Sequence, residues 1–388
     1  MSGKILITAG GTAGHIYPAQ AIIEHLKENL PDIEILYIGT RSGMENRLIP
    51  PLGTVFKKIR ASGFSASRNP LKKVLIYLRF FFNLAAGLLQ SLAILNKYKP
   101  DYVLGMGGYV CAPVFIAAIL LRKKIAIHEQ NVIPGRLNRI FAKYAKYIFL
   151  SFDDSRHYFI EGKKYLSGRM VISGDPVRKQ VREFLKLEPL YTKWGLQSGR
   201  FTVTVFGGSL GAEKINESAI ELYKIFRQES GLQLLLICGN RFFESYSKKL
   251  GELQTVKDNI VFRIYSYIEE MASIYRISDL IISRAGATTI AELATTSIPA
   301  ILVPYPQAIE NHQYFNAEHL VKNKKAVLIS DDKLSGEALS GIITGLLENG
   351  GSKYRLMKDA AIGINNLDSA EIIVNTLFSE RYIQSYEN

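Results

Sequence analysis

Residues 283–316 carry groups whose types and spacing suit a phosphate and a sugar. An apolar β-branched run at 279–283 stops at Arg284-Ala285-Gly286, and a helical pattern follows over 288–296. A helix that begins just after a glycine directs backbone N–H groups and the positive end of its dipole out of its start, where phosphate binds. Glu292 lies one turn further in, where a carboxylate can accept hydrogen bonds from two vicinal ribose hydroxyls. The stretch therefore predicts a nucleotide-sugar site.

A polar cluster opens the next predicted helix of the same region. After a short apolar strand at 299–304, Glu310-Asn311-His312-Gln313 begins a helix that runs on through Asn316. Amide and imidazole side chains at a helix start suit the hydroxyls of a sugar. Any α/β protein has glycines between strands and helices and an occasional glutamate in a helix. The ordered combination therefore carries the prediction, rather than any one of these residues.

A glycine-rich turn follows the first predicted strand, 4–8. It reads Ala9-Gly10-Gly11-Thr12-Ala13-Gly14-His15, and a helix continues from it to about Leu30. Turns of this kind hold phosphate through backbone N–H groups. The turn is not the dinucleotide motif G-x-G-x-x-G, and no acidic residue closes the next strand at 36–40, which weakens an oxidoreductase interpretation. His15, at the helix entrance, is either a functional side chain or an ordinary capping and packing residue.

Two more loops follow predicted strands in the first half of the chain. The strand at 101–104 ends in Gly105-Met106-Gly107-Gly108-Tyr109, and the strand at 125–127 ends in His128-Glu129-Gln130-Asn131. The carboxyl ends of parallel strands lie at one edge of a sheet, so we expect these loops and the loop that ends at His15 to converge on one crevice. The alternative for the second loop is that Glu129 and His128 simply pair with each other.

A basic and aromatic stretch at 57–82 opens a long apolar pattern that continues to Leu95. Its first cations are Lys57, Lys58, Arg60, Arg68, Lys72 and Lys73. The apolar run nearly reaches the length of about 20 residues that spans a bilayer, but Arg79 at the centre of a span would cost roughly 2.5–3.5 kcal/mol. We therefore expect a helix packed partly on the sheet and partly on an anionic membrane surface. A wholly buried core helix is the alternative.

The second half of the chain restarts the opening motif. Pro176 prevents a continuous element after the strand near 171, so a linker begins there. A strand at 201–206 then ends in Gly207-Gly208-Ser209-Leu210-Gly211-Ala212, and a helix follows. This repetition predicts an α/β fold of two Rossmann-like domains, at 1–176 and 177–366, with parallel sheets facing each other across a cleft.

Composition and charge limit the partners. The 388 residues, 47% of them hydrophobic, suffice for two cores. The two cysteines lie in apolar strand-like contexts without C-x-x-C spacing, which indicates a reducing compartment, and the first residues show no apolar signal region, which predicts that the chain is not secreted. The net charge of +13 predicts anionic partners, and in the absence of a nucleic-acid motif we favour lipid and diphosphate over nucleic acid. No Asp-x-Asp motif occurs, so neither a metal nor a cofactor is predicted.

These motifs, in this order, resemble the undecaprenyl-diphospho-muramoylpentapeptide β-N-acetylglucosaminyltransferases, which have the GT-B architecture. The resemblance spans nearly the whole chain and rests on 10–15, 105–109, 128–131, 207–212 and 283–316. The first of these departs from the family's G-G-T-G-G-H because Ala13 replaces a glycine, which restricts the backbone there. The resemblance also implies that the last helix, about 367–388, packs back on the first domain.

The resemblance further implies which residues bind each substrate. The acceptor diphosphate would lie on Gly10, Gly11, Gly107, Gly108 and Tyr109. The donor UDP-N-acetylglucosamine would lie on Thr12, Ala13, Gly14, Asn131, Arg178, Ser209, Ile268, Arg284, Ala287, Thr288, Thr289, Glu292, Gln313 and Asn316. Among these, Asn131 would contact the donor sugar, Ser209 the donor phosphate, and Ile268 would read uracil through its backbone.

The reaction implied is transfer of N-acetylglucosamine, with inversion, to the C4 hydroxyl of undecaprenyl-diphospho-N-acetylmuramoyl-pentapeptide. His15 is the expected base, since a neutral imidazole is favoured near a helix amino terminus, and Glu129 and His128 are the next candidates. The protein would act as a peripheral protein on the cytoplasmic face of the inner membrane. A UDP-N-acetylglucosamine 2-epimerase and a noncatalytic membrane-docked scaffold are the alternatives.

Overall fold

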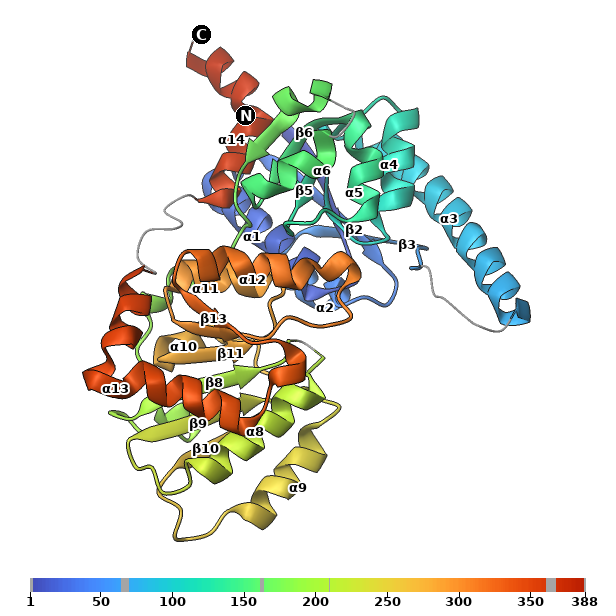
Figure 1. Ribbon diagram of the computed structural model, residues 1–388. Coiled ribbons are helices and arrows are strands. Elements are labelled where there is room, and N and C mark those ends of the chain that lie inside the picture. The colour runs from blue at the N-terminus through green and yellow to red at the C-terminus, as the bar shows by residue number, and fades with distance from the viewer. Residues whose placement is uncertain (1–2, 64–69, 161–163, 209, 361–367, 387–388) are drawn as a thin grey trace. The chain divides into compact units, whose positions relative to one another are not determined.

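The computed structural model describes residues 3–63, 70–160, 164–208, 210–360 and 368–386 (Figure 1). The chain divides into two compact units. Unit 1 consists of Met1–Lys179 and Leu367–Asn388, and unit 2 of Gln180–Asn366. The division after Lys179 lies three residues beyond the boundary expected from Pro176.

Unit 1 is built, within the described residues, on a seven-stranded parallel sheet of order β3-β2-β1-β4-β5-β6-β7. Its strands are β1 (Gly3–Ala9), β2 (Ile33–Thr40), β3 (Val55–Ile59), β4 (Tyr102–Gly107), β5 (Lys124–Glu129), β6 (Ala145–Leu150) and β7 (Met170–Ile172). Its helices are α1 (Ala13–Asn29), α2 (Glu45–Leu48), α3 (Pro70–Tyr98), α4 (Cys111–Leu120), α5 (Arg136–Phe141), α6 (Arg156–Ile160) and α14 (Ser369–Tyr386). Short 3-10 helices occur at Pro50–Leu52, Ala142–Tyr144, Asp153–Ser155 and Lys164–Arg169.

Unit 2 repeats this plan with a six-stranded parallel sheet, counted over the described residues, of order β10-β9-β8-β11-β12-β13. Its strands are β8 (Phe201–Phe206), β9 (Leu232–Ile237), β10 (Val261–Tyr265), β11 (Leu280–Ser283), β12 (Ala300–Leu302) and β13 (Ala326–Leu328). Its helices are α8 (Glu213–Ile225), α9 (Phe243–Leu253), α10 (Met271–Ile277), α11 (Ala287–Thr296), α12 (His312–Lys322) and α13 (Gly336–Ala360). α7 (Lys179–Arg182) begins at the division between the units, and 3-10 turns occur at Phe184–Lys186, Thr192–Trp194, Ile309–Asn311 and Asp331–Lys333.

The predicted α/β class with two parallel-sheet domains is confirmed. Apolar strands buried on both faces are typical of parallel sheets that carry helices on each side, and β1, β4, β8 and β9 have this character. Because all strands of each sheet run parallel, their carboxyl ends share an edge. Each unit therefore presents its glycine-rich loops along one side.

The last helix belongs to unit 1, although the chain reaches it only after the whole of unit 2. α14 lies beside α1, and Ile373, Val374 and Leu377 of α14 are buried in the same core cluster as strands β1 and β2. The ring of Phe378 meets Tyr102 of β4 edge-on, with 6.1 Å between centroids. The C-terminal helix thus covers one face of the first sheet (Figure 1).

Helix α3 is packed over its second half and open to solvent over its first half. Ser91 and Leu95 are buried, and a Cβ atom added at Gly87 would meet the carbonyl oxygen of Arg60 at 2.1 Å. In contrast, Phe81 and Phe82 are about three-fifths exposed, and the first half of α3 extends away from the rest of unit 1 (Figure 1). The alternative of a wholly buried core helix is therefore wrong.

Candidate active site

Two glycine loops of unit 1 meet backbone to backbone. Parallel pairing places Thr8 beside Gly105, so the loops after β1 and β4 leave the sheet at the same edge. Gly108 has a left-handed φ of +86°, and a Cβ atom there would lie 2.1 Å from the carbonyl oxygen of Gly10. Only glycine permits this approach. The ring of Tyr109 lies over Gly11, 3.7 Å from where a Cβ would stand. The structure thus brings together the five residues predicted for the acceptor.

His15 joins this group from the first turn of α1. Its ring lies over Gly107, where an added Cβ would stand 2.7 Å from His15 Nδ1, so the missing side chain makes room for the imidazole. His15 Nδ1 lies 3.1 Å from Oε1 of Gln130, the residue that follows β5. Ala13 is the first residue of α1, where the backbone is helical, and alanine is well suited to that conformation. The expected restriction at Ala13 is therefore satisfied without strain.

Glu129 organises the loop after β5. Its Oε1 accepts hydrogen bonds from the backbone N–H of Asn131 at 3.0 Å and from its Nδ2 at 3.2 Å. Its Oε2 accepts from Gly135 N at 2.9 Å and from Asn138 Nδ2 at 2.7 Å. The residue is 1% exposed. A carboxylate engaged by four donors is not placed to accept a proton from a substrate, so Glu129 is unsuitable as the next candidate for the base.

His128 points away from Glu129. His128 Nε2 lies 3.0 Å from the carbonyl oxygen of Gly174, and its Nδ1 lies 3.1 Å from Gln130 Nε2. Burial lowers the pKa of His128 to about 4, with the hydrogen bond to Gly174 opposing that shift and the charge of His15 adding to it. The ring is therefore neutral near pH 7. The alternative that His128 and Glu129 pair with each other is wrong.

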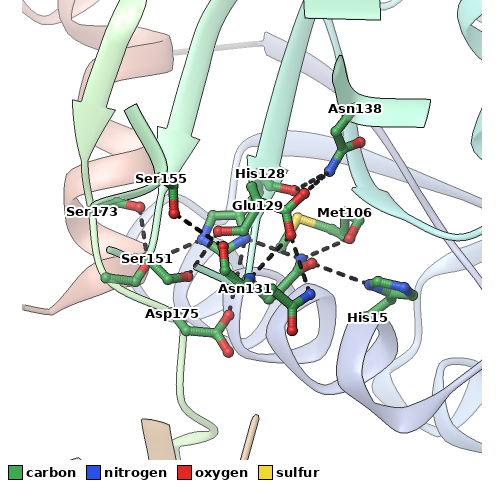
Figure 2. A network of polar contacts seen from close by, with 12 residues as sticks. His15, Met106, His128, Glu129, Asn131, Asn138, Ser151, Ser155, Ser173 and Asp175 are labelled. Atoms are coloured by element: carbon green, nitrogen blue, oxygen red, sulfur yellow. Dashed lines mark hydrogen bonds and ion pairs between the residues drawn. The ribbon is translucent and has the colours of Figure 1, made fainter. Parts of the chain in front are cut away.

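The remaining donor residues predicted in unit 1 lie around α1 and the β5 loop. Thr12 is the exposed N-cap residue of α1 and makes no side-chain cap hydrogen bond. Gly14 follows within the first turn of the helix. The guanidinium of Arg178 stacks on the ring of Tyr17 in α1, 3.9 Å from its centroid. Asn131 is fixed by Glu129, and its carbonyl oxygen accepts a hydrogen bond from Ser155 Oγ at 3.0 Å (Figure 2).

In unit 2, helix α11 begins as the sequence predicts. Gly286 is its N-cap, with φ −66° and ψ 147°, and contributes no side chain to cap the first turn. The N–H dipoles of that turn, which contains Ala287, Thr288 and Thr289, point out of the start of the helix and favour an anion there. Ser209, predicted to bind the donor phosphate, lies outside the described residues.

Glu292 is held by a tyrosine from the neighbouring helix α10. Glu292 Oε2 accepts a hydrogen bond of 2.7 Å from the Tyr275 hydroxyl, and both residues are buried. This bond fixes the direction of the carboxylate on the second turn of α11. Ile268, just after β10, also has a buried side chain, which is compatible with recognition through its backbone.

Arg284 is held by partners at the ends of the neighbouring strands of unit 2. Its Nη1 lies 2.6 Å from Asp331 Oδ1 and donates to the carbonyl oxygens of Val303 and Pro304, each at 3.2 Å. Its guanidinium also lies 5.5 Å from the ring centroid of Tyr305. Through these contacts Arg284 ties the ends of β11, β12 and β13 together just before α11. Its place in the donor site stays a prediction.

Helix α12 supports the turn before α11. Asn316 is fully buried and donates from Nδ2 to the carbonyl oxygen of Ala285 at 3.4 Å. Gln313 Oε1 accepts a hydrogen bond of 2.9 Å from the backbone N–H of Tyr305. Asn316 therefore supports the turn before α11, and the donor-binding roles of Asn316 and Gln313 stay predictions.

Comparison with known proteins supplies the family. Residues 5–150 match the glycosyltransferase family 28 N-terminal domain and residues 202–372 the family 28 C-terminal domain. The chain belongs to glycosyltransferase family 28. Two relatives share the name UDP-N-acetylglucosamine–N-acetylmuramyl-(pentapeptide) pyrophosphoryl-undecaprenol N-acetylglucosamine transferase. The one from Desulfitobacterium hafniense strain Y51 is 38% identical over 96% of this chain and 98% of its own length, and the one from Acetivibrio thermocellus is 36% identical over 94% and 95%.

Solved structures agree with this family assignment. The crystal structure of MurG from Acinetobacter baumannii has a TM-score of 0.71 and 25% identity over 97% of this chain and 99% of that one. A UDP-GlcNAc 2-epimerase from Neisseria meningitidis has a TM-score of 0.65 with 14% identity over 98% of this chain and all of that one. The second likeness shows a shared fold alone. It does not extend the relationship of this glycosyltransferase to the epimerases.

Four residues that contact the candidate site residues or one another, one in unit 1 and three in unit 2, were missed by sequence reasoning. Tyr275, Asp331, Lys214 and Gln130 were not assigned a role. Tyr275 lies in a short apolar helix whose pattern indicates only core packing. Asp331 lies 3.9 Å from Lys214, which is the second residue of α8 and faces the same carboxylate as Arg284. Gln130 is the one of these four residues that the sequence could have indicated, because it lies in the predicted loop 128–131. No group of three or more His, Cys, Asp or Glu side chains is placed to hold a metal ion within the described residues.

Proposed function

We propose that this chain transfers N-acetylglucosamine from UDP-N-acetylglucosamine to the C4 hydroxyl of undecaprenyl-diphospho-N-acetylmuramoyl-pentapeptide. The observation that carries the proposal is the match, over almost the full length of both chains, to relatives that bear the name of this activity. The nucleotide would lie on unit 2 and the lipid-linked acceptor on unit 1. The glycine loops of unit 1 and the uncapped start of α11 in unit 2 suit the two diphosphates of these substrates.

Transfer with inversion requires a base at the acceptor hydroxyl and stabilisation of the departing UDP. His15 supplies the base. It lies beside the two glycine loops that would hold the acceptor diphosphate, so the muramoyl sugar next to that diphosphate would come within reach of the imidazole. The leaving diphosphate would be stabilised by the N–H groups of the first turn of α11. Arg284 and Lys214 share the single carboxylate of Asp331, so the positive charge that remains on this cluster would also favour the diphosphate.

Glu292 would bind the ribose of the donor. Its carboxylate is already directed by Tyr275, so little further ordering is needed when the vicinal hydroxyls arrive. Ile268 would contact the uracil through its backbone, and Asn131 would contact the transferred sugar. The preorganised hydrogen bonds around Glu129 and Glu292 favour binding because the side-chain entropy has been lost on folding.

The membrane surface would meet α3. Leu75, Leu78, Phe81 and Phe82 are all exposed on its first half, and the guanidinium of Arg60 stands 5.4 Å from the Phe82 ring centroid. Lys57 and Lys58 are exposed on the edge strand β3. Apolar side chains bordered by cations are typical of a protein that lies on an anionic leaflet. The protein would therefore work from the cytoplasmic face of the cell membrane, where a lipid-linked acceptor is within reach.

By length and composition, one helix in the described part of the chain, Lys72–Tyr98, could cross a membrane. We propose that it lies on the membrane instead. Ser91 and Leu95 in its second half are buried inside unit 1, and Gln90 Oε1 accepts a hydrogen bond of 2.8 Å from the backbone N–H of Arg60. A crossing would have to break these contacts and place Arg79 in the bilayer.

The deciding experiment measures UDP release and sugar isomerisation together. The protein is incubated with labelled UDP-N-acetylglucosamine, with and without lipid-linked N-acetylmuramoyl-pentapeptide. UDP release that depends on the acceptor, with the label appearing on the lipid, supports the transferase. Isomerisation without the acceptor would indicate an epimerase, and binding without turnover would indicate a scaffold, so either result contradicts the proposed activity.

A further inference from the structure

The side-chain amide of Gln130 has a fixed orientation. Gln130 follows β5 and is 1% exposed. Its Nε2 lies 2.6 Å from the carbonyl oxygen of Met106. A carbonyl oxygen only accepts hydrogen bonds, so the amide nitrogen must be the atom that faces Met106. The amide oxygen, Oε1, is therefore the atom that faces His15 Nδ1 at 3.1 Å.

His128 fixes the same amide independently. His128 Nε2 lies 3.0 Å from the carbonyl oxygen of Gly174, so this nitrogen must carry a proton. The ring is neutral near pH 7, and its Nδ1 is then an acceptor, which takes a hydrogen bond from Gln130 Nε2 at 3.1 Å. The nearest carboxylate oxygen recorded for Nδ1, on Asp175, is 4.0 Å away, beyond hydrogen-bonding distance. The backbone carbonyls of Met106 and Gly174 thus determine which atom donates and which accepts in each hydrogen bond that links His128, Gln130 and His15.

The chain of contacts determines the tautomer of His15. Gln130 Oε1 can only accept, so His15 Nδ1 must be the donor and must carry the ring proton. In a neutral imidazole with Nδ1 protonated, the lone pair is on Nε2. In water the neutral ring favours the opposite tautomer, so the protein must supply this preference.

We propose that Gln130 is a positioning residue that holds neutral His15 in the Nδ1–H tautomer and so makes Nε2 the atom that takes the acceptor proton. This role rests on the proposed transferase function. In the step, the C4 oxygen of the acceptor forms a bond to C1 of N-acetylglucosamine while its proton moves to His15 Nε2. The bond between C1 and the diphosphate oxygen breaks, and UDP leaves with the electron pair. Gln130 also stabilises the imidazolium that results, because Oε1 keeps its hydrogen bond to Nδ1–H.

The size of the effect follows from comparable arrangements. Removing the partner that orients a metal-bound histidine costs about 10- to 100-fold in metal affinity or activity, and imposing the wrong tautomer on the histidine of a serine protease costs about 10⁴-fold. Gln130 is a neutral partner, so the lower range applies. We expect Gln130→Met, which keeps the length of the side chain but removes both polar atoms, to lower kcat about 10- to 100-fold with little change in KM for UDP-N-acetylglucosamine.

The tautomer is measured directly by ¹⁵N NMR of histidine-labelled protein without substrate, at a pH well above the ordinary histidine value of about 6.5. The His15 signals are assigned from their loss in His15→Asn. In the wild type, Nδ1 should show the shift of a protonated ring nitrogen and Nε2 that of an unprotonated one. In Gln130→Met the protonated signal should move wholly or partly to Nε2. A proton on Nε2 in the wild type would overturn the proposal.

Two further variants separate positioning from loss of structure. Gln130→Glu keeps an acceptor for His15 but loses the donor to Met106 and to His128 Nδ1, so the Nδ1–H tautomer of His15 should persist in it even if its stability falls. If Gln130→Met does not fold, the wild-type and Gln130→Glu spectra still decide, since the opposite tautomer in either contradicts the proposal. Gln20→Met is the matched control, because it removes a glutamine hydrogen bond to Glu24 on the same helix as His15 and should change neither spectrum nor kcat.

The positioning role of Gln130 and the proposed transferase function can be refuted independently. A folded Gln130→Met with unchanged kcat, or with its whole loss in KM, would refute the positioning role while the transferase activity of the wild type stands. Absence of acceptor-dependent transfer in the wild type would refute the proposed function, while the NMR spectrum would still report the tautomer of His15.

Discussion

Glu129→Gln should destabilise unit 1, and the hydrogen bonds of Glu129 allow the loss in free energy of unfolding to be estimated. Each oxygen of Glu129 accepts two hydrogen bonds, from Asn131 on one side and from Gly135 and Asn138 on the other. A glutamine must turn its NH₂ group toward one of these pairs of donors. Hydrogen bonds to a charged group contribute roughly 1.5–3 kcal/mol each, so losing two would cost about 3–6 kcal/mol.

Relaxation around Asn138 reduces this cost. Asn138 Oδ1 has no hydrogen-bond partner, so the amide can turn over and accept from the new NH₂ group, although its hydrogen bond to the carbonyl oxygen of His128 is then lost. The free energy of unfolding should therefore fall by about 2–4 kcal/mol. For a unit of about 200 residues this corresponds to a fall in Tm of roughly 4–16 °C.

Scanning calorimetry of the full chain measures this shift, and Glu34→Gln is the control. Glu34 forms an exposed ion pair with Lys4 at 3.0 Å, and such pairs contribute at most about 1 kcal/mol. Glu129→Gln should lower the Tm of the unit 1 transition clearly more than Glu34→Gln does. Equal shifts in the two variants would refute the conclusion that the four hydrogen bonds fix the 129–138 loop. Full stability with complete loss of transfer would instead return Glu129 to the list of candidate bases.

The remaining predictions concern the two substrates, the membrane and pH. His15→Ala should lower kcat about 10²–10⁴-fold with donor KM nearly unchanged, and the acid limb of the wild-type pH profile should disappear; retention of that limb would assign the base elsewhere. Glu292→Ala should weaken donor binding by about 1.5–3 kcal/mol in calorimetric titration, and an unchanged affinity would remove it from the site. Replacing Phe81 and Phe82 by Ser should release the protein from anionic vesicles with no loss of Tm, because both rings are exposed; a large fall in Tm would show that they pack in the core. Burial lowers the pKa of His128 from 6.5 to about 4, so on acidification the unfolded chain binds a proton at a higher pH than the folded chain does. The contribution of His128 to the free energy of unfolding should therefore be complete above pH 6.5 and should fall toward pH 4 by roughly 1.4 kcal/mol per pH unit. Urea titrations at several pH values measure this slope, and His128→Gln should flatten it.

The sequence by itself determined the glycine loops and the strands and helices on either side of them. Apolar β-branched runs that end in glycine are local signals, and the rule that parallel strands share a carboxyl edge turns them into a location. For this reason the loops at 10–15, 105–109 and 128–131 were expected to lie together. The contacts of Gly108 with Gly10 and of His15 with Gln130 show that they do. The start of α11 followed from Gly286 in the same way.

Only the tertiary structure decided the partners of the buried polar side chains. Arg284 and Asp331 follow β11 and β13, which are not neighbours in the sheet, and they meet because both strands end at the same edge. Tyr275 meets Glu292 from a helix that looked merely apolar. A hydrogen bond forms only when donor and acceptor lie within about 3.5 Å and in a narrow range of directions, so spacing along the chain cannot choose among several polar groups at one edge.

The exposure of α3 and the tautomer of His15 were decided in the same way. An apolar helical pattern is the same whether the apolar face of the helix packs on a sheet or meets solvent. Only the burial of Leu95 and the exposure of Phe81 and Phe82 therefore distinguish the packed second half of α3 from its exposed first half. The tautomer depends on which way one amide points. The carbonyl oxygen of Met106 fixes that direction, and no pattern of residue types contains it, because a backbone carbonyl is present at every position of every sequence.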